Sequence, residues 1–421
     1  MPFGFYIIMA AQFFSALADN ALLIASIAAL RDMHAPSEYE PLLKTFFTVS
    51  YVVLAAFVGA FADSMPKWRV MFISNTIKIG GCALMFYSVH PLVAYAVVGL
   101  GAAAYSPAKY GILTEYLPHR LLVVANGWIE GLTVGAIILG VVIGGALIKP
   151  DISAALLAFD FPLIDTGIDT PGEMAICVVG VLYILAALFN LYIPDTGVDH
   201  KPLKRNPFYL IHEFNHCLML LWRDRLGQVS LAVTTLFWGA GATLQFIVIK
   251  WAEAALGLDL AHSSMLQGVC AVGVALGAAV AAKMITLRKS VRVIPLGIAM
   301  GLIVLVMNFV NSIWIAIPLL VIIGGLSGFF VVPMNALLQH RGHILMGAGH
   351  SIAVQNFNEN LSILVMTGLY YAMVKADLSV YWVLTLFGLF VSSAMFLVKR
   401  RHEANQRERD DVIHLDDGGT H

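Results

Sequence analysis

The sequence predicts an all-α membrane protein with twelve transmembrane helices arranged in two six-helix halves. Three observations support this fold class. Of the 421 residues, 59% are hydrophobic and 12% are charged, whereas about half of a soluble domain is apolar and about a quarter is charged. Twelve apolar runs are each long enough to cross a bilayer, which takes about 20 residues. The longest polar stretch, 194–227, separates the sixth run from the seventh.

The expected spans follow one another along the chain with mostly short connections. In the first half they cover residues 5–30, 42–62, 70–89, 92–115, 122–148 and 174–194. In the second half they cover residues 228–252, 261–286, 291–311, 313–338, 347–374 and 378–398. The predicted domains are an N-terminal half at 1–194, a cytoplasmic linker with an amphipathic helix at 195–227, a C-terminal half at 228–400 and a charged cytoplasmic tail at 401–421.

The distribution of basic residues predicts the orientation of the chain. Seventeen of the 25 Lys and Arg residues fall on the side of the two termini, and five fall on the opposite side. Because cytoplasmic loops are enriched in Lys and Arg, both termini are expected in the cytoplasm. The acidic loop 149–173 is then external. The first apolar run is too long for a signal peptide and lacks its basic flank, so it is expected to be a span.

Composition also excludes several classes of function. A net charge of −1 gives no field that would attract nucleic acid. The four cysteines are widely spaced and form no CxxC pattern, so they are expected to be unpaired packing residues. No glycine-rich phosphate loop is present, which argues against ATP as a direct energy source. No cofactor and no enzymatic activity are therefore expected.

The two halves share a weak internal repeat. The fourth span has Lys109 two residues after Pro107, and the tenth has Asn335 two residues after Pro333. The fifth and eleventh spans each begin with an amide followed four residues later by a glutamate, at 126–130 and 355–359, which places both groups on one helical face. Two groups of six spans with repeated halves are typical of major facilitator transporters.

A cytoplasmic gate is predicted after the second span. There Gly59, Asp63, Lys67 and Arg69 follow one another at intervals of four, four and two residues. The glycine permits close helix contact. The carboxylate can accept hydrogen bonds from a helix N-terminus or pair with Arg69. The alternative is an ordinary loop aspartate. The second half has Ala281 at the matching place, so one such gate is expected. The other residues assigned to gating are Glu115 and Arg288.

Several polar residues inside the expected spans are candidates for substrate binding or coupling. Asp19 lies about ten residues from either end of the first span, and an acid at mid-membrane depth indicates a functional site. The alternative is a structural pair with an intramembrane lysine. Lys109 suits a phosphate contact, with Asp19 and Glu130 as candidate ion-pair partners. The other candidates are Gln12, Asn20, Asn126, Asn335, Gln339, Gln355, Asn356 and Glu359.

The linker contains the sequence His-Glu-Phe-Asn-His, which matches the H-E-x-x-H signature of zinc proteases. A zinc-dependent membrane hydrolase that uses His212, Glu213 and His216 is therefore one alternative function. Against it, no third-ligand pattern follows, and the motif lies on an amphipathic stretch expected at the membrane surface.

Five blocks of the sequence resemble the bacterial lysophospholipid transporters of the major facilitator superfamily. They include Asp-Asn-Ala-Leu-Leu and Ser-Pro-Ala-Lys-Tyr-Gly, and they cover residues 11–23, 101–113, 236–244, 328–339 and 347–360. The resemblance implies a major facilitator fold in the bacterial inner membrane. It also implies movement of lysophosphatidylethanolamine and related lysolipids from the outer to the inner leaflet. An acyltransferase-acyl carrier protein synthetase then re-acylates them as a functional partner.

On this interpretation Asp19 binds the ammonium of the lipid headgroup and Lys109 binds the phosphate. One residue departs from the family pattern, because Gln245 stands where the family has a basic residue in the seventh span. We expect a monomer that contacts membrane lipids, with alternating access as the mechanism. The alternative within the same fold is a proton-coupled transporter of another amphiphile or drug, with coupling through Asp19.

Overall fold

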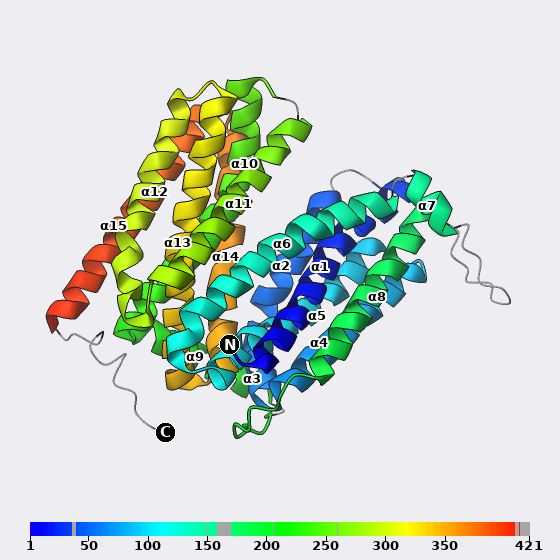
Figure 1. Cartoon of the computed structure of the whole chain (residues 1–421), viewed down its shortest axis with the longest axis horizontal. Coiled ribbons are helices and arrows are strands. Elements are labelled where there is room, and N and C mark those ends of the chain that lie inside the picture. Colours follow the sequence, from blue (N-terminus) through cyan, green and yellow to red (C-terminus); the bar gives the residue numbers. More distant parts are fainter. Residues whose placement is uncertain are drawn as a thin grey trace. The chain divides into compact units, whose positions relative to one another are not determined.

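The computed structural model describes residues 1–35, 39–148, 150–157, 170–204, 206–258, 260–408 and 412. Within these ranges all regular structure is helical (Figure 1). The first helices are α1 (Phe3–Asp32), α2 (Tyr39–Val53), α3 (Ala55–Asp63), α4 (Lys67–Phe86), α5 (Pro91–Tyr116), the 3-10 turn η1 (His119–Leu121), α6 (Leu122–Ile148), α7 (Pro150–Leu157) and α8 (Pro171–Leu191). They are followed by α9 (Pro207–Arg223), α10 (Arg225–Leu256), α11 (Leu260–Met284), η2 (Leu287–Val293), α12 (Ile294–Val306), η3 (Met307–Phe309), α13 (Ile313–Met346), α14 (Ala348–Lys375) and α15 (Val380–Glu408).

The helices account for the twelve expected spans. In the described part of the chain, nine are long and apolar enough to cross a membrane, and α2 with α3 forms a tenth that is bent by 63°. The remaining two expected spans are α4 and α14, which are 20 and 28 residues long. Both contain ionisable or amide side chains in their central turns, such as Lys78 in α4 and Glu359 in α14. Each of these two helices therefore contains a buried ionisable group.

Two regions differ from the expectation. The acidic loop 149–173 contains the short helix α7, and its residues 158–169, with Asp160, Asp165 and Asp169, lie outside the described residues. The charged segment that begins at residue 401 starts inside α15, which continues to Glu408. Pro107 and Pro333 lie inside helices that continue through them. The four cysteines are free.

The described helices pack into two compact units whose limits differ from the predicted halves. The first unit contains Met1–Ile112 and Gly135–Ile211, and the second contains Leu113–Val134 and His212 onward. The end of α5 and the first half of α6 therefore cluster with the C-terminal helices. This assignment matters for function because the polar residues of these two segments belong to the second unit.

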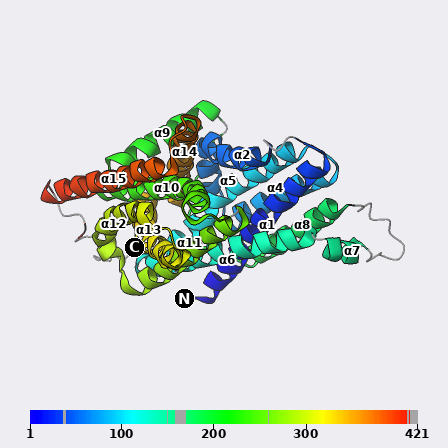
Figure 2. The ribbon, with the colours of Figure 1, turned by 90° about the horizontal axis from the view of Figure 1, so that it is seen from above.

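The core of the first unit is formed by α1, α4, α5 and α8. Figure 2 shows α1, α4 and α8 side by side, and α8 packs against both of the others. Small residues of α1, such as Ala18, Ala21 and Ala25, are fully buried against α8 residues that include Tyr183. This close packing of small residues is typical of membrane helices, and it holds the side chains of α1, α4 and α8 in fixed positions.

The second unit is built around the contact of α11 with α13. Gly277 and Gly324 lie directly against the backbone of the facing helix, so that a side chain at either position would collide with it. The buried Trp251 of α10 donates a hydrogen bond from Nε1 to the carbonyl oxygen of Met307, at 2.9 Å. Helix α14 packs against α10 and α13, which places its polar face inside this unit.

Candidate functional site

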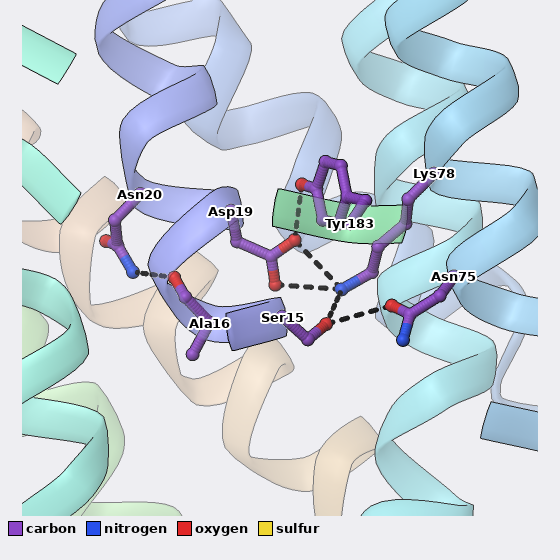
Figure 3. A network of polar contacts seen from close by, with 7 residues as sticks. All are labelled: Ser15, Ala16, Asp19, Asn20, Asn75, Lys78 and Tyr183. Atoms are coloured by element: carbon purple, nitrogen blue, oxygen red, sulfur yellow. Dashed lines mark hydrogen bonds and ion pairs between the residues drawn. The ribbon is translucent and has the colours of Figure 1, made fainter. Parts of the chain in front are cut away.

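An ion pair between Asp19 of α1 and Lys78 of α4 lies in the core of the first unit (Figure 3). The Lys78 Nζ atom is 2.8 Å from Asp19 Oδ1 and 2.9 Å from Oδ2. The Tyr183 hydroxyl of α8 donates to Asp19 Oδ1 at 2.7 Å. Lys78 also donates to Ser15 Oγ at 3.0 Å, and Ser15 donates to Asn75 Oδ1 at the same distance. We call these five residues the Asp19 cluster.

Aromatic rings and a glycine complete the environment of Lys78. Its Nζ lies 5.0 Å from the ring centroid of Tyr105 and 5.4 Å from that of Tyr183, within the range of a cation–π contact. A Cβ atom at Gly101 of α5 would come within 2.7 Å of Lys78 Cγ and 2.8 Å of the Ser74 carbonyl oxygen. Glycine at this position therefore lets α5 approach α4 beside the lysine side chain.

The two charges of the pair differ in their access to solvent or lipid. The Lys78 side chain is 1% exposed, whereas that of Asp19 is 22% exposed. A lysine this deeply buried depends on the carboxylate for charge compensation. The carboxylate retains an open side that a second cationic group could approach.

The ion pair corrects the predicted partner of Asp19. Lys109 was one candidate, but the lysine that pairs with Asp19 is Lys78. Asp19 thus forms an ion pair with an intramembrane lysine, as one of the two sequence interpretations expected. Charge balance could have found Lys78, because an intramembrane acid needs a base at similar depth. The sequence offers two such lysines in the first half, Lys78 and Lys109. Only the packing of α8 against both α1 and α4, which brings Lys78 to Asp19, distinguishes them.

Three other predicted residues, Gln12, Lys109 and Asn20, belong to the first unit. Gln12 Nε2 donates to the backbone oxygen of Lys109 at 3.3 Å, which joins α1 to α5. The Lys109 Nζ atom lies 4.8 Å from the ring centroid of Tyr110. Asn20 donates to the carbonyl oxygen of Ala16 on its own helix and lies on the side of α1 away from Lys78 (Figure 3).

The predicted gate contains a second buried ion pair. Lys67 Nζ is 2.9 Å from Asp63 Oδ1 and donates to the Ala62 carbonyl oxygen at 2.7 Å. Arg69, the partner expected from the sequence, lies over the Trp68 ring at 5.1 Å and forms no ion pair within the described chain. Gly59 is buried on α3, on the same helix as Asp63. Glu115 is half-buried near the end of α5, and Arg288 is exposed on η2.

In the second unit, amide and carboxyl groups of α13 and α14 form a buried network. Gln355 Nε2 donates to Asn335 Oδ1 at 3.1 Å and to Glu359 Oε1 at 2.7 Å. Nearby in the same unit, Asn126 of α6 and Gln339 of α13 exchange two hydrogen bonds of 2.8 and 2.9 Å. Three residues singled out from the sequence, Asn335, Gln355 and Glu359, are therefore joined by hydrogen bonds. We call Asn335, Gln355 and Glu359 the Glu359 cluster.

Three further candidates also belong to the second unit or its helices. Glu130 of α6 is 5% exposed. Asn356 is also buried, and its carbonyl oxygen accepts a hydrogen bond from Asn360. Gln245 is exposed on α10 and donates to Gln267 Oε1 of α11 at 2.7 Å. The residue that replaces the expected base is thus joined to a neighbouring helix by a neutral contact.

The H-E-x-x-H residues lie on the predicted amphipathic helix, which is α9. Its Phe214 and Leu221 are buried, and the Phe214 ring contacts that of Phe357 on α14. His212 and His216 are exposed, whereas Glu213 Oε2 is 3.8 Å from His350 Nε2 of α14. Among the described residues, no group of three or more His, Cys, Asp or Glu side chains is placed to hold a metal ion.

Comparison with known proteins identifies the family. The family model described as Major Facilitator Superfamily matches residues 8–367. The chain belongs to the Major Facilitator Superfamily. It is therefore a multi-pass membrane transporter and not an enzyme, and the all-α fold predicted from the sequence is confirmed.

Curated relatives confirm the resemblance to the bacterial lysophospholipid transporters. The chain is 41% identical over 378 residues to "Lysophospholipid transporter LplT" of Yersinia enterocolitica, with 90% of this chain and 89% of that protein covered. It is 42% identical over 369 residues to the protein of the same name from Yersinia pestis strain Pestoides F, with 87% and 86% covered.

Solved structures show the same fold at low sequence identity. The human organic anion transporter MFSD10 is 13% identical and has a TM-score of 0.72, with 94% of this chain and 100% of that chain covered. A variant of the Escherichia coli fucose:proton symporter FucP is also 13% identical and has a TM-score of 0.71, with 94% and 98% covered.

Proposed function

We propose that this chain transports lysophospholipids, notably lysophosphatidylethanolamine, from the outer to the inner leaflet of the bacterial inner membrane by alternating access. The observation that carries the proposal is the identity of 41–42% with transporters named for lysophospholipids, over about 90% of the chain. The Asp19 cluster supports it, since this cluster offers charged groups inside an apolar core to a substrate with an ammonium and a phosphate.

In the proposed mechanism Asp19 receives the headgroup ammonium on its exposed side. Lys78 and Tyr183 fix the carboxylate through three hydrogen bonds and leave that side open. A carboxylate has about four lone-pair directions, so a further donor can be accommodated. Lys78 thus serves as the resident counter-ion, and the ammonium adds to the pair without replacing it.

Lys109 is the proposed phosphate contact. Its backbone is tied to α1 through Gln12, and its ammonium lies over Tyr110 on the same helix. A lysine ammonium is a compact point charge that suits a phosphate oxygen. The acyl chain needs no specific partner, because the apolar helices and the bilayer both solvate it.

The gate, orientation and partner are further parts of this proposal. The buried Asp63–Lys67 pair, with Gly59, is proposed to hold the cytoplasmic side closed, and Arg69, Glu115 and Arg288 are proposed to assist it. The excess of basic residues on the side of the termini supports a cytoplasmic location for both. The product would be consumed by an acyltransferase-acyl carrier protein synthetase. The proposed working form is a monomer.

Uptake by proteoliposomes tests the substrate. Purified protein is reconstituted, fluorescent lysophosphatidylethanolamine is added outside, and the fraction protected from an impermeant quencher is followed. We expect faster protection than in protein-free vesicles, a loss of most of this rate in D19A, and an unchanged rate in the control D151N on α7. Equal rates with and without protein would overturn the substrate assignment, and normal uptake by D19A would remove Asp19 from the site.

A further inference from the structure

Glu359 is a carboxyl group inside the second unit for which no cation of the described chain supplies charge compensation. It is 6% exposed and lies about three turns, or roughly 16 Å, from the start of α14 at Ala348. That depth is about half the thickness of the hydrocarbon layer. Its hydrogen bond from Gln355 is neutral, and no Lys, Arg or His of the described chain lies within ion-pair distance of it. It thus contrasts with Asp19, which has its own lysine.

Among the described residues, the groups of neighbouring helices that act on Glu359 are neutral or acidic. From α10 the Thr234 hydroxyl lies close to the carboxyl, and from α13 Asn335 contacts it through Gln355. The charged group that acts on it is Glu130 of α6, which is itself buried. The nearest ion pair on the same helix lies toward its start, between His350 and Glu213 of α9.

This environment disfavours a permanent negative charge. Burial removes the hydration of a carboxylate, and a second carboxylate nearby raises the cost of ionising both. The cluster also lacks a hydrogen-bond donor for one acceptor. The buried Gln355 Oε1 atom has no hydrogen-bond partner in the described chain. A protonated carboxyl would carry an O–H group next to this amide. A proton is small enough to reach a group that is closed to larger cations.

We propose that Glu359 is a proton-binding site that couples lysolipid movement to proton movement, with Glu130 as the neighbouring carboxyl and Gln355 as a positioning residue. In each cycle one proton binds the Glu359 carboxylate while the site is open to one side, and the same proton leaves on the other side. This inference rests on the proposed transport function for its role, although the binding of the proton itself does not. It assigns coupling to Glu359 and not to Asp19, whose charge Lys78 already balances.

Infrared difference spectroscopy of the purified protein tests proton binding directly. In the wild type we expect a protonated-carboxyl C=O band that disappears as the pH is raised. E359Q should lack this band, and the control E253Q, which removes a carboxyl paired with Lys250 at 3.2 Å, should retain it. E130Q should change the pH at which the band disappears, because it removes the charge of a neighbouring carboxyl group. A wild-type protein without such a band, or an E359Q protein that keeps it, would overturn the proposal.

Transport tests the coupling separately. An inward-directed proton gradient is expected to change the initial uptake of lysophosphatidylethanolamine severalfold in wild-type proteoliposomes. E359Q should lose that response, whereas the control E253Q should retain it. A wild-type rate that ignores the gradient, or an E359Q rate that follows it, would refute coupling. Absence of wild-type uptake under every condition would instead refute the transport function, and the infrared result would still decide the proton site. If E359Q fails to fold, the wild-type and E130Q titrations give the answer.

Discussion

Removing either member of the Asp19–Lys78 pair should destabilise the protein unequally. D19N leaves a lysine that is 1% exposed without an anion, and breaking a buried pair in this way costs about 3–5 kcal/mol. K78M leaves a carboxylate that keeps its hydrogen bond from Tyr183 and is 22% exposed, so its cost should fall nearer the ~1–3 kcal/mol of a buried group with a lost partner. D19N should therefore be the more damaging substitution.

The double variant D19N/K78M separates charge compensation from packing. It removes both charges and keeps similar side-chain volumes, so its stability should lie within about 1–2 kcal/mol of the wild type. The coupling free energy should then exceed about 2 kcal/mol, as for contacting residues. Reversible unfolding in mixed detergent micelles measures the four free energies. The exposed pair Lys250–Glu253 is the control, and its cycle should give less than about 1 kcal/mol. Additive single-variant effects, or a larger cost for K78M than for D19N, would refute the reasoning.

Three further substitutions follow from the geometry. G101A should lower the free energy of unfolding by about 1–3 kcal/mol through overpacking against Lys78, which is measured as a lower thermal midpoint. The control G80A should be neutral, because a Cβ atom there meets nothing within 4 Å. Equal effects of the two substitutions would contradict the contact between Gly101 and Lys78. Q245R should lower the half-saturating concentration of lysophosphatidylglycerol by up to about fivefold, the value of an exposed ion pair, and an unchanged uptake curve would exclude a role in headgroup binding. D63N should destabilise by about 3 kcal/mol or more, because its lysine partner is buried, and should slow uptake; a wild-type rate and midpoint would exclude the gate.

The overall architecture could be predicted because membrane spans leave a strong signal in the sequence. Runs of about 20 apolar residues and the asymmetry of Lys and Arg are properties of single segments, and neither depends on contacts. The amphipathic helix α9 was also predictable from spacing alone. The helix α7 was missed, because a stretch of eight residues between acidic positions gives no such signal. The assignment of residues 113–134 to the second unit depends on tertiary packing, which no periodicity records.

The candidate sites were predictable by residue but only partly by partner. Asp19, Gln355 and Glu359 could be selected because polar groups at membrane depth are energetically costly and therefore indicate a functional site. The partner of Asp19 could not, since Lys78 and Lys109 are both lysines in apolar helices of the first half. Gly101 gives the clearest example of what sequence alone hides. It lies in a run of small residues, and only the structure shows that its packed neighbour is Lys78.

The two units use their buried polar groups for different chemistry. In the first, a carboxylate and a buried lysine form an ion pair. In the second, amides surround Glu359, and its charge changes if a proton binds. A transporter needs fixed groups that recognise the substrate and a group whose state differs between conformations, because a ligand shifts an equilibrium only through different affinities for the two states. A neutral ion pair meets the first need and an uncompensated carboxyl meets the second. E359K should therefore abolish the dependence of uptake on the proton gradient. Removal of Lys78 should instead reduce the stability of the protein.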